Sequence, residues 1–155
     1  MQALFCWDFV TIHNQRFFLY NLLMTRVNVI PPSELSDQHL IAEYHELPRV
    51  IKQKIDTSGA PGCFVLGAGH MRWARAHWKF TCDRFCEICA EMKYRGFNVN
   101  FAPESLREYV CNICGDGEYV VTNADIEKNR ERIREKYNKK PEFYRWTRRK
   151  RPDWL

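Results

Sequence analysis

The side chains most able to do chemistry lie close together between Gln38 and Glu46. In a helix, Gln38, His39, Tyr44 and Glu46 span little more than two turns. The amide, imidazole and phenol can form hydrogen bonds to a bound molecule, and the carboxylate can take up a proton. A single glutamate is most often a solvated surface residue, so Glu46 indicates proton transfer only where other features point to a substrate.

The cysteines suggest a second kind of chemistry. Cys86 and Cys89 form one C-x-x-C pair and Cys111 and Cys114 another, with a spacing just outside that of a zinc ribbon. Cys82 lies one helical turn before the first pair. Because that pair falls within a predicted helix, whereas zinc ribbons use turns, we expect buried thiols and no metal or other cofactor, with bound zinc as the alternative. Seven cysteines in a chain without a secretory signal indicate a reducing compartment.

Charge is concentrated at one end of the chain. The net charge is +5, yet residues 128 to 151 hold 12 Lys or Arg and only 3 Glu, so this segment is +9 and the remainder −4. Phe143, Tyr144, Trp146 and Trp154 are interleaved with these basic residues, a combination that suits stacking on bases. The pattern favours a nucleic acid as the partner, and a solvated charged tail is the alternative.

Helical spacing accounts for most of the remaining chain. Leu35, Leu40 and Tyr44 belong to an apolar stripe that predicts a first helix over about 33–47, with Ser33 as its cap and Pro48 ending it or opening the next helix. A long helix is predicted over 71–95, ended by a left-handed glycine at position 96, and a last one from about 122 to just before residue 141. Residues 97 to 121 read as loop with one short element.

These features predict an all-α, compact single domain of about three main helices with long loops and a basic aromatic C-terminal tail. The apolar stretches are too short to cross a membrane, so no membrane partner is expected. Gly67-Ala68-Gly69 lacks the spacing and the following Lys-Ser or Lys-Thr pair of a phosphate loop. His70 is expected to be a helix-cap or packing residue.

Residues 1–23 show no clear period and are treated as an extension of uncertain status, with residues 24–155 as the domain. Three interpretations stay open: a packed extension, a removable leader, or sequence upstream of a true start at Met24. We favour the start at Met24, because threonine at position 25 is small enough for the initiator methionine to be removed.

The chain resembles the phage-type endonuclease V family, the pyrimidine-dimer DNA glycosylases with abasic-site lyase activity. The resemblance rests on four segments that occur in the family's order: MTRVNVIPPSELSDQHLIAEYHELPR (24–49), FVLGAGH (64–70), KYRGFNVN (93–100) and REKYNKKPEFYRW (134–146). It implies that the amine of Thr25, once freed, attacks the deoxyribose C1′ and that Glu46 assists. It also implies that DNA is contacted by Arg26, Gln38, His39 and Arg49 near the lesion and by Arg132 and Lys136 on the last helix.

Elementary chemistry agrees with that implied mechanism. An α-amino group has a reference pKa near 7.7 to 8.0, against about 10.4 for lysine, so much more of it is unprotonated and nucleophilic at neutral pH. An imine at C1′ acidifies the C2′ proton, and a carboxylate that takes this proton allows the 3′ phosphate to leave. A Thr25 that remained inside the chain would have no free amine for this reaction.

One position departs from the family pattern. His45 stands where the family has arginine, immediately before the glutamate, so a phosphate contact there becomes weaker and dependent on pH. The sequence thus predicts a monomeric cytoplasmic enzyme, nucleoid-associated when bound, that acts on double-stranded DNA with damaged pyrimidines or abasic sites. The rivals are a non-catalytic, zinc-stabilised nucleic-acid-binding protein and an abasic-site lyase without dimer specificity.

Overall fold

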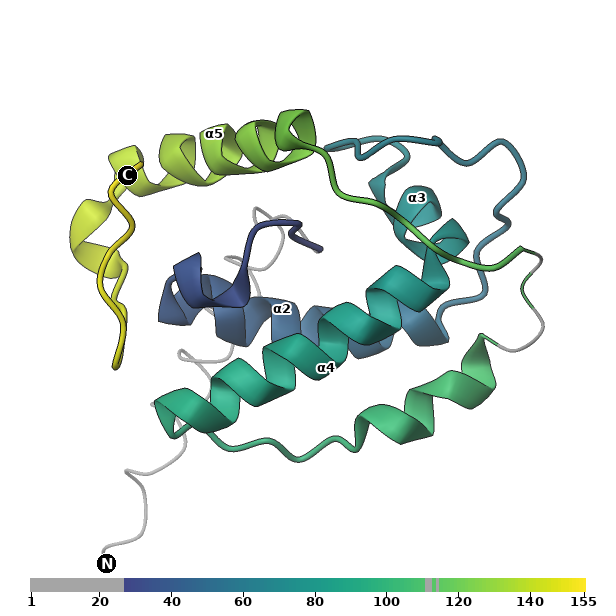
Figure 1. The fold of residues 1–155 in the computed structure, drawn as a ribbon, viewed down its shortest axis with the longest axis horizontal. Coiled ribbons are helices and arrows are strands. Elements are labelled where there is room, and N and C mark those ends of the chain that lie inside the picture. The colour runs from purple at the N-terminus through teal and green to yellow at the C-terminus, as the bar shows by residue number, and fades with distance from the viewer. Residues whose placement is uncertain (1–26, 111–112, 114) are drawn as a thin grey trace, which may run out of the picture.

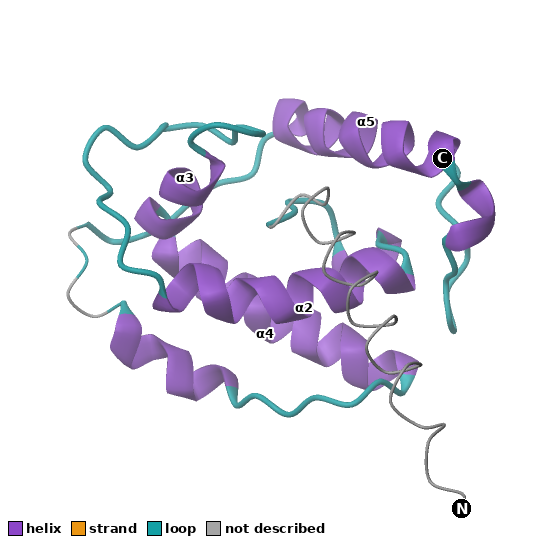
Figure 2. Ribbon diagram, turned by 180° about the vertical axis from the view of Figure 1, so that it is seen from behind, coloured by secondary structure: helices purple, strands orange, loops and turns teal. Residues whose placement is uncertain are grey.

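The computed structural model describes residues 27–110, 113 and 115–155, and this part of the chain is all-α, with no strand (Figures 1 and 2). The expectation of a helical domain is confirmed. The α-helices are α2 (Asp37–Lys52), α3 (His70–Ala76), α4 (Trp78–Arg95) and α5 (Asn123–Lys139), joined by three 3-10 helices, η1 (Pro32–Glu34), η2 (Pro103–Tyr109) and η3 (Pro141–Phe143).

The core forms where α2 and α4 pack against each other (Figure 1). Leu40, Leu47, Phe85 and Ile88 are fully buried and are part of one apolar cluster. The segment that leads into α2 runs between that helix pair and α5, as Figure 1 shows, and Val27 and Ile30 of this segment are also fully buried. The chain just before α2 is therefore a core element.

The predicted first helix is corrected at both ends. Pro31 and Pro32 open the short η1 turn, and α2 begins only after Ser36, whose hydroxyl accepts a hydrogen bond from the backbone N–H of His39 at 3.2 Å. Ser36, and not Ser33, is thus the N-cap. Pro48 lies inside α2 and neither ends it nor opens another helix. The helix continues because Val50 and Ile51, one turn on, are buried in the core, which offsets the roughly 3 kcal/mol that an interior proline costs.

The predicted helix over 71–95 is two helices, because the chain turns at His77. Backbone N–H groups in the first turn of α4 find their hydrogen-bond acceptor in a distant loop: Lys79 N and Phe80 N both donate to the carbonyl of Gly117 at 3.1 Å. The hydroxyl of Thr81 donates to the carbonyl of Ala74 at 2.7 Å and fixes the corner from within. A loop residue distant in sequence thus sets the start of α4, which helical periodicity alone does not reveal.

Gly117 should be intolerant of a side chain. Its φ of +68° belongs to the left-handed region, and a Cβ there would meet ring atoms of Trp78 at 2.6 Å and the backbone nitrogen of Lys79 at 2.7 Å. We expect Gly117→Ala to lower the free energy of unfolding by about 2 to 4 kcal/mol, from backbone strain together with overpacking, as measured by urea denaturation.

Gly59 provides the matched control for that substitution. Its φ of +64° is nearly the same, but nothing lies within 4 Å of a Cβ built on it. Gly59→Ala should therefore cost only the backbone term, about 1 to 2 kcal/mol. Equal losses in the two variants would contradict the proposed role of the Trp78 contact.

Two predicted helix ends are confirmed. Gly96 has a φ of +85° at the end of α4, and Phe97 N donates to Met92 O at 2.9 Å, as a left-handed C-cap requires. Helix α5 begins with a capping box, in which Thr122 Oγ1 accepts from Asp125 N and Asp125 Oδ2 accepts from Thr122 N. Its last residue, Lys139, lies two positions before Pro141, as predicted.

The basic C-terminal segment folds back on the domain. Arg149 donates two hydrogen bonds to the Glu91 carboxylate, at 2.9 and 2.8 Å, and the backbone N–H of Thr147 donates to Asp37 at the start of α2. The indole N–H of Trp154 donates to Glu34 Oε2 at 2.7 Å. The indole N–H of Trp146 donates to Glu34 O at 3.1 Å. Part of the basic charge and both tail tryptophans thus hold the tail to η1, α2 and α4.

Candidate active site

A buried polar cluster fixes the segment that follows position 26. The carboxylate of Glu43 accepts from Asn28 N at 3.0 Å and from Asn28 Nδ2 at 2.9 Å, and it also accepts from Arg84 Nε at 3.0 Å. Arg84 Nη1 donates to Ile30 O at 2.7 Å. Since both charged side chains are almost fully buried, Glu43 and Arg84 form an internal ion pair that joins α2 and α4 to this segment.

Helices α5 and α3 complete the attachment. Asn129 Oδ1 accepts from Val29 N at 2.8 Å, and Asn129 Nδ2 donates to Asn28 Oδ1 at 2.9 Å. The His70 Nδ1–H donates to Val65 O at 2.7 Å, which leaves Nε2 to accept from Val27 N at 3.1 Å. His70 is thus a neutral packing residue, as predicted, and the backbone from Val27 onward is held by four helices.

Glu46 lies one turn beyond Glu43 on the same side of α2. It is 8% exposed, and its Oε1 accepts from Arg49 Nη1 at 3.1 Å. Arg49 is mostly exposed, with 62% of its side-chain surface accessible. The structure thus brings Glu46 and Arg49 together, with the carboxylate partly sheltered and the guanidinium at the surface, an arrangement suited to a base beside a phosphate contact.

His39 of α2 and Lys136 of α5 lie close enough to interact electrostatically. His39 Nδ1 is 2.7 Å from Ser36 Oγ, and its ring stacks on Tyr144 with centroids 5.0 Å apart. His39 Nε2 and Lys136 Nζ are both buried, and neither has a hydrogen-bond partner among the described residues. Burial, and then the charge of Lys136, lower the pKa of His39 to about 3.

Lys136 is shifted in the same direction. Burial of its amine, and then the positive charges of Arg132 and Lys139, lower its pKa to about 7. A bound anion would reverse both penalties, because it supplies the missing hydrogen-bond acceptor and the missing negative charge. His39 Nε2 of α2 and Lys136 Nζ of α5 are thus two buried polar atoms without partners among the described residues, and both are candidates for contact with an anionic group such as a phosphate.

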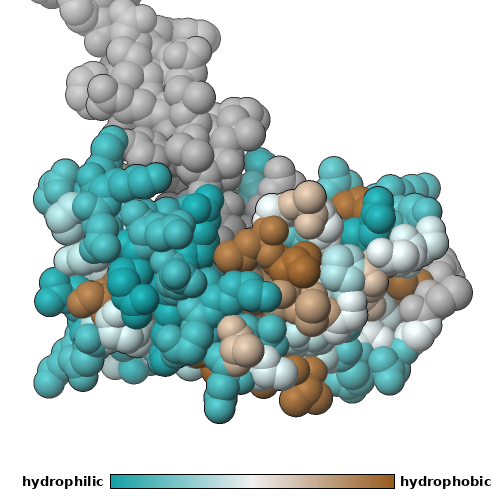
Figure 3. All heavy atoms as spheres, turned by 90° about the horizontal axis from the view of Figure 1, so that it is seen from above, coloured by the Kyte–Doolittle hydropathy of each residue, from teal (hydrophilic) through white to brown (hydrophobic). Residues whose placement is uncertain are grey.

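The other predicted contact residues have partners within the protein. Gln38 Oε1 accepts from the backbone N–H of Arg145 at 3.0 Å, which fixes the tail beside the first turn of α2. Arg132 lies one turn before Lys136 on α5 and pairs with Glu135 at 2.9 Å, with 41% of its side-chain surface accessible. The face that α5 presents is strongly hydrophilic (Figure 3).

Two predicted residues, Thr25 and Arg26, lie outside the described residues. So do Cys111 and Cys114, and bound zinc therefore stays a prediction. Of the first pair, Cys89 is buried as expected, whereas Cys86 is exposed, which corrects the expectation of buried thiols there. Within residues 27–110, 113 and 115–155, no group of three or more His, Cys, Asp or Glu side chains is placed to hold a metal ion. In the same part of the chain, no helix is long and apolar enough to span a bilayer.

The comparison with known families shows the family to which the chain belongs. Residues 24–105 match the family model described as pyrimidine dimer DNA glycosylase. The chain belongs to this family. The residues that hold Val27–Ile30, which we call the clamp, are Glu43, His70, Arg84 and Asn129. The matched range contains Thr25, Glu46, Arg49 and the clamp residues of α2, α3 and α4, while Lys136 lies beyond it. Membership makes the protein a DNA repair glycosylase whose substrate is DNA, which confirms the resemblance seen in the sequence.

Sequence reasoning missed most of the clamp. Glu43, Arg84 and Asn129 carry no motif of their own, and their neighbours in sequence give no sign that charged side chains will be buried. The one available signal was Asn28, a polar residue within the apolar run Val27–Ile30, whose side chain needs buried partners if that run is a core element.

Proposed function

We propose that this glycosylase also cuts the DNA strand, through an imine between the Thr25 amine and C1′ of the damaged nucleotide. The observation that carries the proposal is the four-helix clamp on Val27–Ile30. The clamp fixes the backbone of Val27 and Asn28, and two residues of any chain span at most about 7 Å, which supports an amine at position 25 acting near this segment. Glu46 lies one turn from Glu43, which binds Asn28, and is therefore within reach of the same nucleotide.

The proposed reaction proceeds in balanced steps. The amine nitrogen forms a bond to C1′ as the glycosidic bond breaks, and the base leaves with the electron pair and takes up a proton. Loss of a proton from nitrogen gives a glycosylamine, whose C1′–O4′ bond then breaks; O4′ takes up a proton, and the nitrogen lone pair forms the C=N bond of the protonated imine. The Glu46 carboxylate then takes a proton from C2′, the electron pair forms the C2′–C3′ double bond, and the 3′ phosphate leaves. Water finally hydrolyses the imine and frees the protein.

The proposed DNA contacts follow the charges on α2 and α5. Arg49 and Arg132 are exposed enough to reach phosphates, and the buried pair His39 and Lys136 would be satisfied by a phosphate oxygen. Gln38 and Arg26 are proposed to lie near the lesion. A nucleotide turned out of the duplex would give the amine access to C1′. We propose that residues 24–155 act as one monomeric cytoplasmic domain.

His45 bears on the choice of lesion. It is exposed beside Glu46, and partial burial of its ring, followed by the charge of Arg49, lowers its pKa. It is therefore neutral at physiological pH and gives weaker electrostatic attraction to phosphate than arginine would. Cleavage at an existing abasic site is the part of the proposed activity that depends least on this position.

Borohydride trapping tests the imine directly. Protein that begins at Thr25 should form a covalent adduct with abasic DNA when borohydride is added, because reduction converts the imine to a stable amine. The 155-residue chain, with its N-terminus verified by mass spectrometry, should form none. Adduct formation by the longer chain would move the nucleophile to a lysine, and no adduct with either form would favour the non-catalytic binder.

The low pKa of Lys136 gives a prediction for binding. Phosphate favours the protonated amine, so binding should weaken as pH rises through about 7, by about tenfold between pH 6 and pH 8. Lys136→Arg keeps its charge over this range and should bind with a flatter pH dependence. Fluorescence anisotropy with an uncleavable abasic duplex measures both, and parallel curves for the two proteins would exclude Lys136 as the titrating contact.

A further inference from the structure

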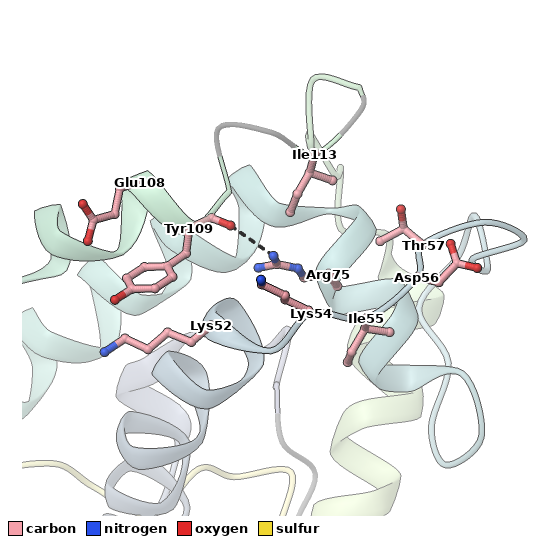
Figure 4. Close-up of a pocket in the computed structure, with 9 residues that line it drawn as sticks. All are labelled: Lys52, Lys54, Ile55, Asp56, Thr57, Arg75, Glu108, Tyr109 and Ile113. Carbon is pink, nitrogen blue, oxygen red and sulfur yellow. Dashed lines mark hydrogen bonds between the residues drawn. The ribbon is translucent and has the colours of Figure 1, made fainter.

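A second basic site lies at the far end of α2, in a pocket of about 580 Å³ next to the loop that follows the helix (Figure 4). Lys52 and Lys54 line it together with Arg75 of α3 and Tyr109 of η2. Figure 4 shows Lys54 directed toward the Arg75 guanidinium, while Lys52 extends below the Tyr109 ring, with its amine 5.2 Å from the ring centroid. Three cations from two parts of the chain, the end of α2 with the loop that follows it and helix α3, thus line one concave surface.

Arg75 anchors this pocket without a counter-charge. Its side chain is buried, and it donates to the backbone carbonyls of Ile51 and Tyr109, the latter at 3.0 Å. Among the described residues, no carboxylate forms an ion pair with Lys52, Lys54 or Arg75. A buried guanidinium that has only neutral carbonyl partners, with two lysines beside it, favours an anion in the pocket.

The two acidic residues of the lining do not supply that negative charge. The Asp56 carboxylate accepts two hydrogen bonds from Ser58, from the backbone N–H at 2.9 Å and from the hydroxyl at 2.5 Å. In Figure 4, Asp56 and Glu108 are both directed away from Arg75. The three cations of the lining thus outnumber its two carboxylates, and neither carboxylate points toward the Arg75 guanidinium.

The pocket lies at the end of α2, the helix that also carries Glu46 and Arg49 of the proposed active site. His45, Arg49 and Lys52 are all exposed, and at spacings of four and three residues they lie on one side of the helix. Glu46 and Lys52 are six residues apart, which is about 9 Å along the axis, or about three nucleotides of one DNA strand. A strand held at Glu46 could therefore continue over Arg49 to the pocket.

We propose that the Lys52–Lys54–Arg75 pocket binds a backbone phosphate of the DNA duplex on one side of the lesion, a contact that rests on the proposed function. Lys52 and Lys54 would contact the phosphate oxygens, while Arg75 holds the ends of α2 and η2 in place and contributes its charge. The contact carries no information about the lesion and extends the length of duplex that the enzyme covers.

The test compares two double variants. The pocket variant carries both Lys52→Ala and Lys54→Ala. The control variant carries both Lys79→Ala and Lys93→Ala on α4, and it loses the same number of positive charges. Binding is measured on three duplexes that carry an uncleavable abasic site. The first has a long stretch of base pairs on both sides of the site. In the second and third, the stretch on one side or on the other is shortened to about two base pairs. The pocket variant should bind the long duplex several-fold more weakly. Its slope of log affinity against log salt should fall by about 0.9 for one lost contact and about 1.8 for two.

Truncation gives the decisive comparison. The difference between the pocket variant and the wild type should disappear on one of the two shortened duplexes and persist on the other, while the α4 variant behaves like the wild type throughout. Unchanged affinity and slope on the long duplex, or an equal loss on all three, would overturn the pocket contact even if strand cleavage is normal. A wild-type protein that neither binds nor cuts abasic DNA would overturn the proposed function, and the contact with it.

Discussion

Glu46→Gln should reduce single-turnover cleavage at a preformed abasic site by a factor of about 10² to 10⁴, the usual contribution of a positioned general base. The amide has nearly the size of the carboxylate and its oxygen can still accept from Arg49, which now approaches Glu46 at 3.1 Å. What the variant loses is the ability to take the C2′ proton. Affinity for an uncleavable abasic duplex should therefore change little.

Glu127→Gln is the control for that substitution. Glu127 is exposed on α5 and pairs with Arg130, so its conversion removes one carboxylate without reaching the proposed site. Its cleavage rate should equal that of the wild type. Near-normal cleavage by Glu46→Gln would remove Glu46 from the mechanism, whereas loss of both binding and cleavage would indicate a role in holding the fold or the DNA.

The largest effect on stability is expected from Glu43→Gln. Glu43 and Arg84 are buried, with side-chain exposures of 0% and 3%, and their closest approach is 3.0 Å. Removing the carboxylate charge leaves the buried guanidinium with only the exposed Glu87 carboxylate, at 3.6 Å, as a counter-charge. Breaking a buried pair in this way costs about 3 to 5 kcal/mol. Urea denaturation should show a large fall in the free energy of unfolding, and the weakened attachment of Asn28 should lower cleavage as well.

Two further variants show whether the loss comes from the buried charge. Glu135→Gln breaks the surface pair with Arg132 and should change stability by no more than about 1 kcal/mol. The double substitution Glu43→Leu with Arg84→Met removes both charges and should recover part of the stability lost by Glu43→Gln. A Glu43→Gln protein as stable as Glu135→Gln would show that the buried pair is not what holds the segment.

Glu43 and Glu46 show why the site could be predicted only in part. They are three residues apart on one helix, and by residue type and spacing they are equivalent. Local sequence cannot separate them, because the difference lies in Arg84 and Asn28, which come from other parts of the chain. Only the resemblance to a family singled out Glu46 before the structure was known.

Local rules predicted the features that depend on neighbouring residues. The glycine cap at the end of α4, the start of α5 near Thr122 and the apolar stripe of α2 each follow from contacts within a few positions, and all three are present. The same rules failed at Pro48 and at the corner before α4. There, burial of Val50 and Ile51 and the carbonyl of Gly117 outweigh the local preference.

By itself, the sequence determined an all-α domain, a basic C-terminal segment and membership of a DNA repair family. The tertiary structure alone decided which polar residues are buried together: Glu43 with Arg84, and His39 with Lys136. The reason is physical. A helix cap or an apolar stripe is selected by contacts a few residues away, whereas the cost of burying a charge depends on partners that only folding brings within hydrogen-bonding distance.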